Sequence, residues 1–137
     1  MAWELFDYVN ARSENEFKKW TLGLQKGYLG KLNSKIDLLE QHGMGLLPNM
    51  LEGPLVGYPN TYKLTCKGRV QLRPMLCRGP VKNDQEFTFL IGATERDWEY
   101  VPSNAPKEAE NRRLEVLADS KNRRRAHEKV GVPRKNP

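Results

Sequence analysis

The chain has 137 residues, of which 38% are hydrophobic, and a formal net charge of +6 at pH 7. This length suits one domain with a modest hydrophobic core, and no apolar run reaches the roughly 18 residues that a membrane helix needs. The N-terminal residues lack the basic and apolar regions of a secretory signal. The sequence therefore predicts a cytoplasmic protein with no membrane partner.

The positive charge is concentrated in two parts of the chain. Residues 105–137 contain ten Lys and Arg residues against five Asp and Glu residues. Residues 53–83 contain no acidic residue at all, whereas six basic residues fall there: Lys63, Lys67, Arg69, Arg73, Arg78 and Lys82. Such blocks favour a polyanionic partner, which can be nucleic acid, an acidic protein or an anionic surface.

The cysteines and histidines indicate no metal chemistry. Cys66 and Cys77 lie in strand-like apolar runs, as expected of buried, reduced thiols. His42 and His127 are far apart and show no metal-ligand spacing. We expect neither a metal nor another cofactor.

The first half of the chain predicts a strand followed by two helices. Residues 3–9 can form a strand, and Ser13 with Glu16 matches the capping-box pattern at a helix start. Two apolar stripes at helical spacing follow, the first made by Phe17, Trp20, Leu24 and Tyr28 and the second by Leu32, Ile36 and Leu39. Glycines at 27–30 should end or kink the first helix, and Gly43 should end the second. Residues 44–60 read as an ordered loop.

The middle of the chain predicts three strands, at residues 62–67, 69–73 and 87–91. Lys67-Gly68 is the expected turn between the first two, and Pro74 implies a bulge or an edge. The alternation places Lys63, Lys67, Arg69 and Arg73 on the outer face of this hairpin. One face of an antiparallel sheet is often merely solvated. Because like charges on neighbouring strands repel, a face of one sign favours a ligand-binding surface.

A third helix is predicted from about residue 106 to the arginines at 123–125, with Pro106 in its first turn. We expect one α+β domain over residues 1–120, in the order β-α-α-β-β-β-α, with a small antiparallel sheet packed on the two N-terminal helices. Residues 121–137 then form a basic, flexible tail. Its basic residues either suit a helix C-terminus or contact a nucleic acid or a partner.

Four short motifs carry a resemblance to a known family. They are the helix end LNSKIDLLEQHG, the pair 54–57 (PLVG) and 62–64 (YKL), the segment 92–100 (GATERDWEY), and the helix opening 104–109 (NAPKEA). In this order they resemble the RelE/HigB superfamily of bacterial and phage toxins, over roughly residues 16–118. That family cleaves messenger RNA and is neutralised by an antitoxin.

The resemblance implies a site on the middle strands and just after the last strand. It makes Lys63, Arg73, Arg96, Glu95 and Tyr100 the catalytic candidates, with Lys67, Arg69, Arg78 and Lys82 as RNA-binding residues. The second lysine of the family's strand is Thr65 here, and the strand arginine is either Arg69 or Arg73, of which we favour Arg73. Some members carry an arginine where this chain has Thr94, and Arg96 is the candidate substitute. Trp98 is expected to pack in the core or at the rim of the sheet.

The residues themselves are suited to metal-free RNA cleavage. This reaction needs a base for the 2′-OH, positive charge on the phosphate and an acid for the leaving oxygen. Arginine supplies the charge as a fixed fork. Glu95, or a lysine whose pKa is lowered by neighbouring cations, is the candidate base, and Tyr100 can stack on a base or donate a proton.

Three interpretations remain open at this stage. The first is a toxin that inhibits translation as a messenger-RNA endoribonuclease, acting on free or ribosome-bound RNA and held by a cognate antitoxin. The second is the same scaffold without nuclease activity, as in the ParE branch that poisons gyrase. The third is a basic nucleic-acid-binding module whose arginines only hold phosphates.

Overall fold

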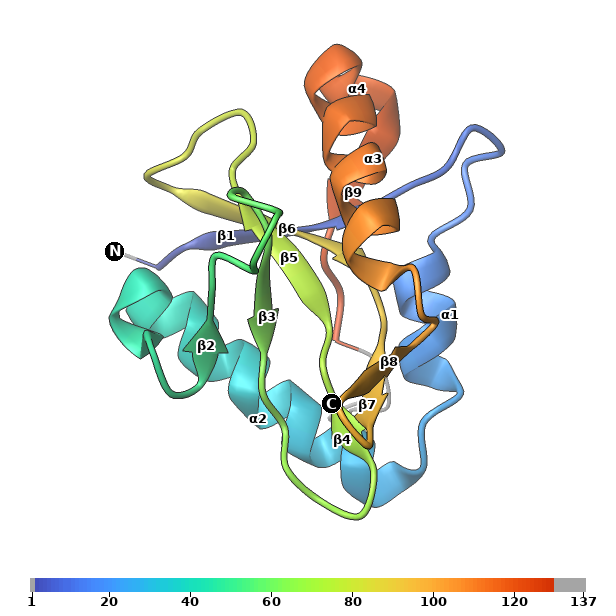
Figure 1. The fold of residues 1–137 in the computed structure, drawn as a ribbon. Helices are drawn as coiled ribbons and strands as arrows, with labels where there is room; N and C mark the ends of the chain where they lie inside the picture. The colour runs from blue at the N-terminus through green and yellow to red at the C-terminus, as the bar shows by residue number, and fades with distance from the viewer. Residues whose placement is uncertain (1, 130–137) are drawn as a thin grey trace, which may run out of the picture.

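The chain has a mixed α+β fold in which helices pack on both faces of a central sheet (Figure 1). The computed structural model describes residues 2–129. Within that range the helices are α1 (Glu16–Leu22), α2 (Lys26–His42), α3 (Ala105–Ala118) and α4 (Ser120–Arg123), with a 3-10 turn η1 (Gly43–Leu46). No helix in this part of the chain is long and apolar enough to cross a membrane.

The strands form two sheets. The larger sheet has six strands in the order β2 (Leu51–Glu52), β3 (Tyr62–Leu64), β5 (Met75–Arg78), β6 (Glu86–Ile91), β1 (Glu4–Tyr8) and β9 (Arg124–Ala126). Its pairs are antiparallel except β1 with β6, which run parallel. The smaller sheet joins β4 (Gln71–Leu72), β7 (Thr94–Arg96) and β8 (Glu99–Val101). This second sheet of three short strands was not predicted.

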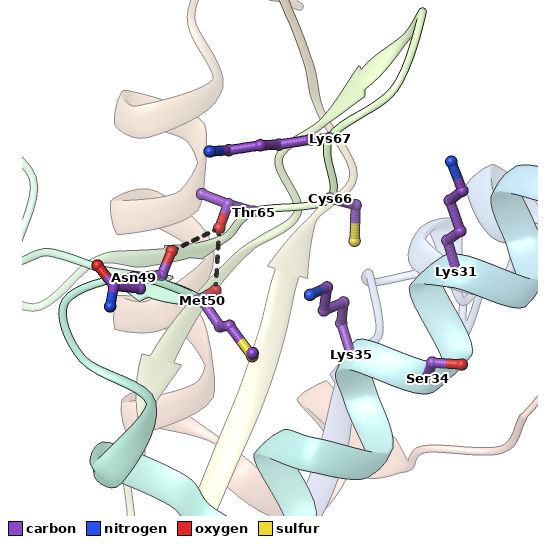
Figure 2. A pocket seen from close by; sticks show the side chains of 8 residues that line it. All are labelled: Lys31, Ser34, Lys35, Asn49, Met50, Thr65, Cys66 and Lys67. Carbon is purple, nitrogen blue, oxygen red and sulfur yellow. Dashed lines mark hydrogen bonds between the residues drawn. The ribbon is translucent and has the colours of Figure 1, made fainter.

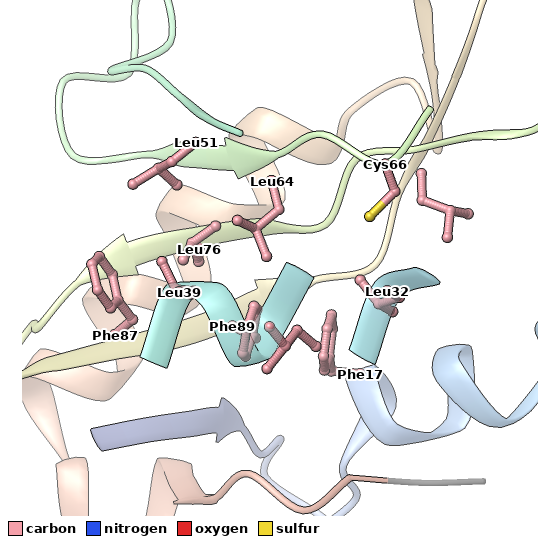
Figure 3. Packing of buried hydrophobic residues seen from close by; sticks show 11 residues of the cluster. Phe17, Leu32, Leu39, Leu51, Leu64, Cys66, Leu76, Phe87 and Phe89 are labelled. Carbon is pink, nitrogen blue, oxygen red and sulfur yellow. The ribbon is translucent and has the colours of Figure 1, made fainter. Parts of the chain in front are cut away.

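The strand β6 lies at the centre because its sequence, EFTFLI, is buried at every position. Phe87 and Phe89 point to the face covered by α1 and α2, where the packed cluster of Figure 3 includes Phe17 and Leu39. The opposite face packs on α3 through a second cluster that contains Leu90. Each fully buried Leu or Phe side chain contributes about 1.5–3 kcal/mol. Helix α3 thus covers β5, β6 and β1 on this face of the sheet.

The start of α1 differs from the prediction. Asn15, not Ser13, is the N-cap residue, and its side chain accepts a hydrogen bond from the Lys18 backbone N–H at 2.9 Å. Ser13 lies in a turn at φ 62°. Glu16 instead pairs with Arg112 of α3 at 2.6 Å. The capping-box prediction was wrong because a longer-range ion pair takes the glutamate.

The two N-terminal helices are separated earlier than predicted. α1 ends at the C-cap residue Gly23, and the glycines at 27 and 30 lie inside α2. The end of α2 at Gly43 is confirmed: this residue has φ +52°, and a Cβ there would overlap the indole of Trp3.

The middle strands pair differently from the predicted hairpin. β3 pairs with β5, so that Lys63 lies opposite Met75. Residues 71–72 leave the large sheet and pair with β7, while Cys66 and Leu72 exchange backbone hydrogen bonds that close the loop between them. Pro74, which cannot donate to a ladder, lies at this change of sheet. The pairing register is irregular just after it, between Met75 and Leu76.

The C-terminal segment also differs from the prediction. The helix ends at Ala118, and the arginines at 124 and 125 belong to β9, which pairs with β1. The His127 backbone N–H donates to Leu5, and the His127 ring contacts the buried Asp7 at 2.8 Å. Residues 121–129 of the expected flexible tail are thus part of the fold; the remainder of that tail lies outside the described residues.

Candidate functional site

Four predicted site residues gather where β3 approaches the smaller sheet. Glu95 of β7 lies opposite Tyr100 of β8 in the hairpin. Its Oε1 atom is 3.0 Å from Arg73 Nε and 3.6 Å from Lys63 Nζ. The Lys63 ammonium group also donates to the Tyr100 hydroxyl at 2.9 Å. Lys63, Arg73, Glu95 and Tyr100, which we call the Glu95 network, form one connected set.

Arg73 is held firmly inside this network. It is 9% exposed, and its guanidinium makes four hydrogen bonds: to Glu95, to the carbonyl groups of Cys66 and Leu72, and to the Gln71 side chain. An arginine has five N–H groups. One donor is therefore left for a ligand, whereas a phosphate fork needs two. In this arrangement Arg73 mainly positions Glu95.

Lys63 is a cation in the folded chain. Burial alone would lower the pKa of this lysine. The hydrogen bond to Tyr100 and the nearby carboxylates of Glu95 and Glu52 outweigh burial and raise the pKa above its usual value. The expectation of a lysine base with a lowered pKa is thus wrong for Lys63. Its role is to supply positive charge.

Two hydrogen-bonding groups of the network are without a partner among the described residues. Glu95 Oε2 makes no hydrogen bond to any described residue, so this oxygen can accept a proton. The Tyr100 oxygen accepts from Lys63, which leaves the phenol hydrogen free to be donated. The set combines a proton acceptor, a proton donor and a fixed cation.

A groove of about 430 Å³ lies beside the network. It is lined by residues in and on either side of β4, in β7 and in the β7–β8 turn: Arg69, Gln71, Arg73, Glu95, Arg96, Asp97 and Trp98. The Arg96 side chain is 88% exposed and lies 3.8 Å from the equally exposed Asp97. Exposed pairs of this kind are weak, so Arg96 is available to a ligand.

Trp98 lies at the tip of the β7–β8 hairpin and is 94% exposed. Asp97 and Trp98 form a two-residue turn with φ values of 52° and 67°, the backbone geometry of a type I′ turn. The prediction that Trp98 packs in the core or at the sheet rim was wrong. The turn was hard to foresee, because type I′ turns usually carry Asn-Gly or Asp-Gly.

The remaining predicted RNA-binding residues are divided among different places. Arg69 lines the groove, whereas Lys67 lines a different cavity next to α2. Arg78 and Lys82 lie at the far end of β5 and in the loop after it, where Arg78 pairs with Asp84 at 2.5 Å. In Figure 1 this loop and the β7–β8 hairpin are on opposite sides of the molecule. Sequence reasoning also missed Gln71, which connects Arg73 to the Gly68 carbonyl.

Comparison with known proteins gives no neighbour for this arrangement. No family model, no curated protein and no solved structure matches the chain. The function is therefore inferred from the residues of the site.

Proposed function

We propose that the chain binds single-stranded RNA in the groove beside the Glu95 network and cleaves it without a metal ion. One observation carries the proposal: a single hairpin joins an exposed tryptophan and an exposed arginine to a partly buried acid–base network. Trp98 and Arg96 lie at its tip, and Glu95 and Tyr100 lie at its base.

The binding step uses general features of single-strand recognition. Aromatic side chains stack on bases of any sequence, and cations follow the phosphate backbone. Trp98 offers an unobstructed ring, while Arg69 and Arg96 line the same groove. The formal charge of +6 adds a long-range attraction for a polyanion.

The cleavage step would use the 2′-OH of the bound RNA as the nucleophile. Glu95 Oε2 takes the 2′ proton, the 2′ oxygen forms a bond to phosphorus, and the bond to the 5′ oxygen breaks. Tyr100 gives its proton to that leaving oxygen, while Lys63 and Arg96 offset the negative charge on the phosphorane. The products are a 2′,3′-cyclic phosphate and a 5′-hydroxyl end.

The order of the elements supports a toxin of the RelE/HigB type. When β2, β4, β7, β8, β9 and the short helices η1 and α4 are left aside, the remaining elements run β1, α1, α2, β3, β5, β6 and α3, which is the order β-α-α-β-β-β-α of that family. Under this proposal the substrate is messenger RNA in the cytoplasm, free or on the ribosome. A cognate antitoxin protein would restrain the activity.

A second candidate function is RNA or DNA binding without cleavage. The hydrogen bonds of Arg73 favour this function, because four of them already engage the guanidinium within the protein and leave it little capacity to bind a phosphate. The presence of Thr94 where some family members have an arginine also leaves a ParE-like toxin without nuclease activity as an alternative.

Incubation of the purified chain with single-stranded RNA in the presence of EDTA tests the proposal, with RNA ends mapped. We expect cyclic-phosphate ends, and a rate that falls roughly 100-fold or more in Glu95→Gln while RNA affinity changes little. Tyr100→Phe should act in the same direction. Glu99→Gln is the matched control, because Glu99 is an exposed glutamate on β8 outside the network.

Circular dichroism of each variant tests whether the fold is kept. Equal cleavage by Glu95→Gln and the wild type would refute the acid–base assignment. Tight RNA binding with no cleavage by the wild type would establish the second candidate instead.

A further inference from the structure

A second basic cavity, of about 480 Å³, lies between α2 and the chain segment after β3. Figure 2 shows that Lys31 and Lys35 reach it from α2 and that Lys67 reaches it from the opposite side. The other lining residues are uncharged: Ser34, Asn49, Met50, Thr65 and Cys66. Among the residues that the structure describes, no acidic side chain lines this cavity, which we call the lysine pocket.

The three ammonium groups of the lysine pocket have no ionic partner within the described chain. Among residues 2–129, none of Lys31, Lys35 and Lys67 is within salt-bridge distance of a carboxylate. Lys63, in contrast, lies within 4 Å of two. Like charges that face one hollow repel one another, so their grouping does not serve stability.

Cys66 does not neutralise these lysines. Burial raises the pKa of this thiol to about 11, although the positive charges of Lys35 and Lys31 act in the opposite direction. The group is thus an uncharged thiol at neutral pH, and the pocket keeps its full positive charge.

The hydroxyl groups of the pocket already donate to the backbone. Thr65 donates to the Asn49 carbonyl at 2.8 Å, and Ser34 donates to the Gly30 carbonyl at 3.1 Å (Figure 2 shows the Thr65 contact). The remaining donors are the Asn49 side-chain amide and the three ammonium groups, which favour a ligand with several anionic acceptor oxygens. A phosphate group has this chemistry.

The lysine pocket is next to the RNA groove along the chain. Lys67 lines the pocket and Arg69 lines the groove, and their Cα atoms are at most about 8 Å apart because consecutive Cα atoms are separated by about 3.8 Å. Gly68 lies between them, and a Cβ at this position would lie 3.2 Å from the Tyr28 ring and 3.8 Å from Lys31 Nζ. A few nucleotides of one strand can span this loop.

We propose that the lysine pocket binds the phosphodiester backbone of the same RNA strand that occupies the groove, a few nucleotides away from Trp98. This inference rests on the proposed RNA binding and extends its binding track from the hairpin to α2. Under this inference the pocket raises the affinity for RNA and lengthens the stretch of strand that is bound. It takes no part in cleavage.

The test compares a triple variant, Lys31→Gln, Lys35→Gln and Lys67→Gln, with a charge-matched control, Lys19→Gln, Lys107→Gln and Lys121→Gln. The control lysines are exposed and line neither cavity. Fluorescence anisotropy measures the affinity for 2′-O-methyl RNA of three and of twelve nucleotides over a range of salt concentrations. Cleavage of unmodified RNA is measured in parallel.

We expect the pocket variant to bind the 12-mer at least tenfold more weakly, while its affinity for the 3-mer stays unchanged. The slope of log affinity against log salt should fall by about 0.7 for each phosphate that the variant no longer binds. Equal losses of affinity in the pocket variant and the control, or an unchanged affinity in the pocket variant, overturn the inference even if the wild type cleaves RNA. A selective loss without any cleavage by the wild type supports the pocket and refutes the nuclease. A wild type that binds no RNA refutes both.

Discussion

Replacing Trp98 by glycine should separate stability from RNA binding. The residue has φ 67° at the second position of a type I′ turn, and a left-handed backbone costs a residue with a side chain about 1–2 kcal/mol. Glycine adopts this conformation without that cost. Because the indole is 94% exposed, its removal sacrifices little buried area. We therefore expect the free energy of unfolding to stay the same or to rise by about 1 kcal/mol.

RNA binding should change in the opposite direction. Stacking of one base on an aromatic side chain contributes about 1–3 kcal/mol, which corresponds to a loss of roughly 5- to 150-fold in affinity. Urea unfolding gives the stability, and anisotropy with 2′-O-methyl RNA gives the dissociation constant. Val81→Ala is the control, since it also trims an exposed apolar side chain but lies beyond the opposite end of β5.

Two results would refute this reasoning about Trp98. A loss of more than about 1 kcal/mol in stability would show that the indole packs on the protein. An unchanged RNA affinity would show that Trp98 does not stack on a base. The proposed function would then lose the observation on which it depends.

Three further predictions concern the body of the fold. Burial raises the pKa values of Cys66 and Cys77 to about 11 and about 12. Both thiols should therefore react very slowly with a disulfide reagent at pH 8 and rapidly after unfolding in urea. Fast reaction of the native protein would contradict their burial. Gly92→Ala should lower the free energy of unfolding by about 1–3 kcal/mol in urea titrations, because a Cβ there overlaps the ring of Trp20; an unchanged midpoint would show that the ring can move. Asp7→Ala should cost about 2–4 kcal/mol by the same measurement, because the carboxylate is 1% exposed and the side chains of Asn15 and His127 lose their partner; a cost below about 1 kcal/mol would contradict this.

The elements that the sequence predicted well are those with a strong local pattern. The strand β6 is rich in large apolar residues, and α2 has four buried residues at helical spacing before Gly43. The coarse α+β fold followed from these elements. The strands β4 and β7 have only two and three residues, and their pairing joins positions about twenty residues apart. No local pattern reports a contact of that kind.

The C-terminal strand was missed for a related reason. Residues 124–126 (RRA) have no apolar alternation, and helix was the natural interpretation of a basic segment after α3. Their position is fixed by the backbone of β1 and by two contacts of Arg124, an ion pair with the buried Glu86 and a stack on the Phe6 ring. Such partners are more than thirty residues away and become visible only in the fold.

Four residues predicted for the candidate site lie together in the structure, but their burial and pairing were not predicted from the sequence. The spacing of Glu95, Arg96 and Tyr100 placed them on one segment, and the hairpin then sends Arg96 to solvent and the other two toward Lys63. Alternation in a continuous strand would have exposed Arg73 beside Lys63. The change of sheet at Pro74 buries it instead, and no periodicity rule includes that change.

The basic residues consequently fall into two groups with different physical roles. Arg73 is buried and Lys63 is partly buried, and both lie close to the Glu95 carboxylate, which holds these two cations in fixed positions. Arg69, Arg96 and the lysine pocket carry charge that no described carboxylate neutralises closely, so a bound strand releases counterions mainly there. A charge that must orient a reacting group has to be rigid, and a charge that must attract a moving strand has to be exposed. Under the proposed function, the Glu95 network would orient the reacting groups and the exposed cations would bind the strand.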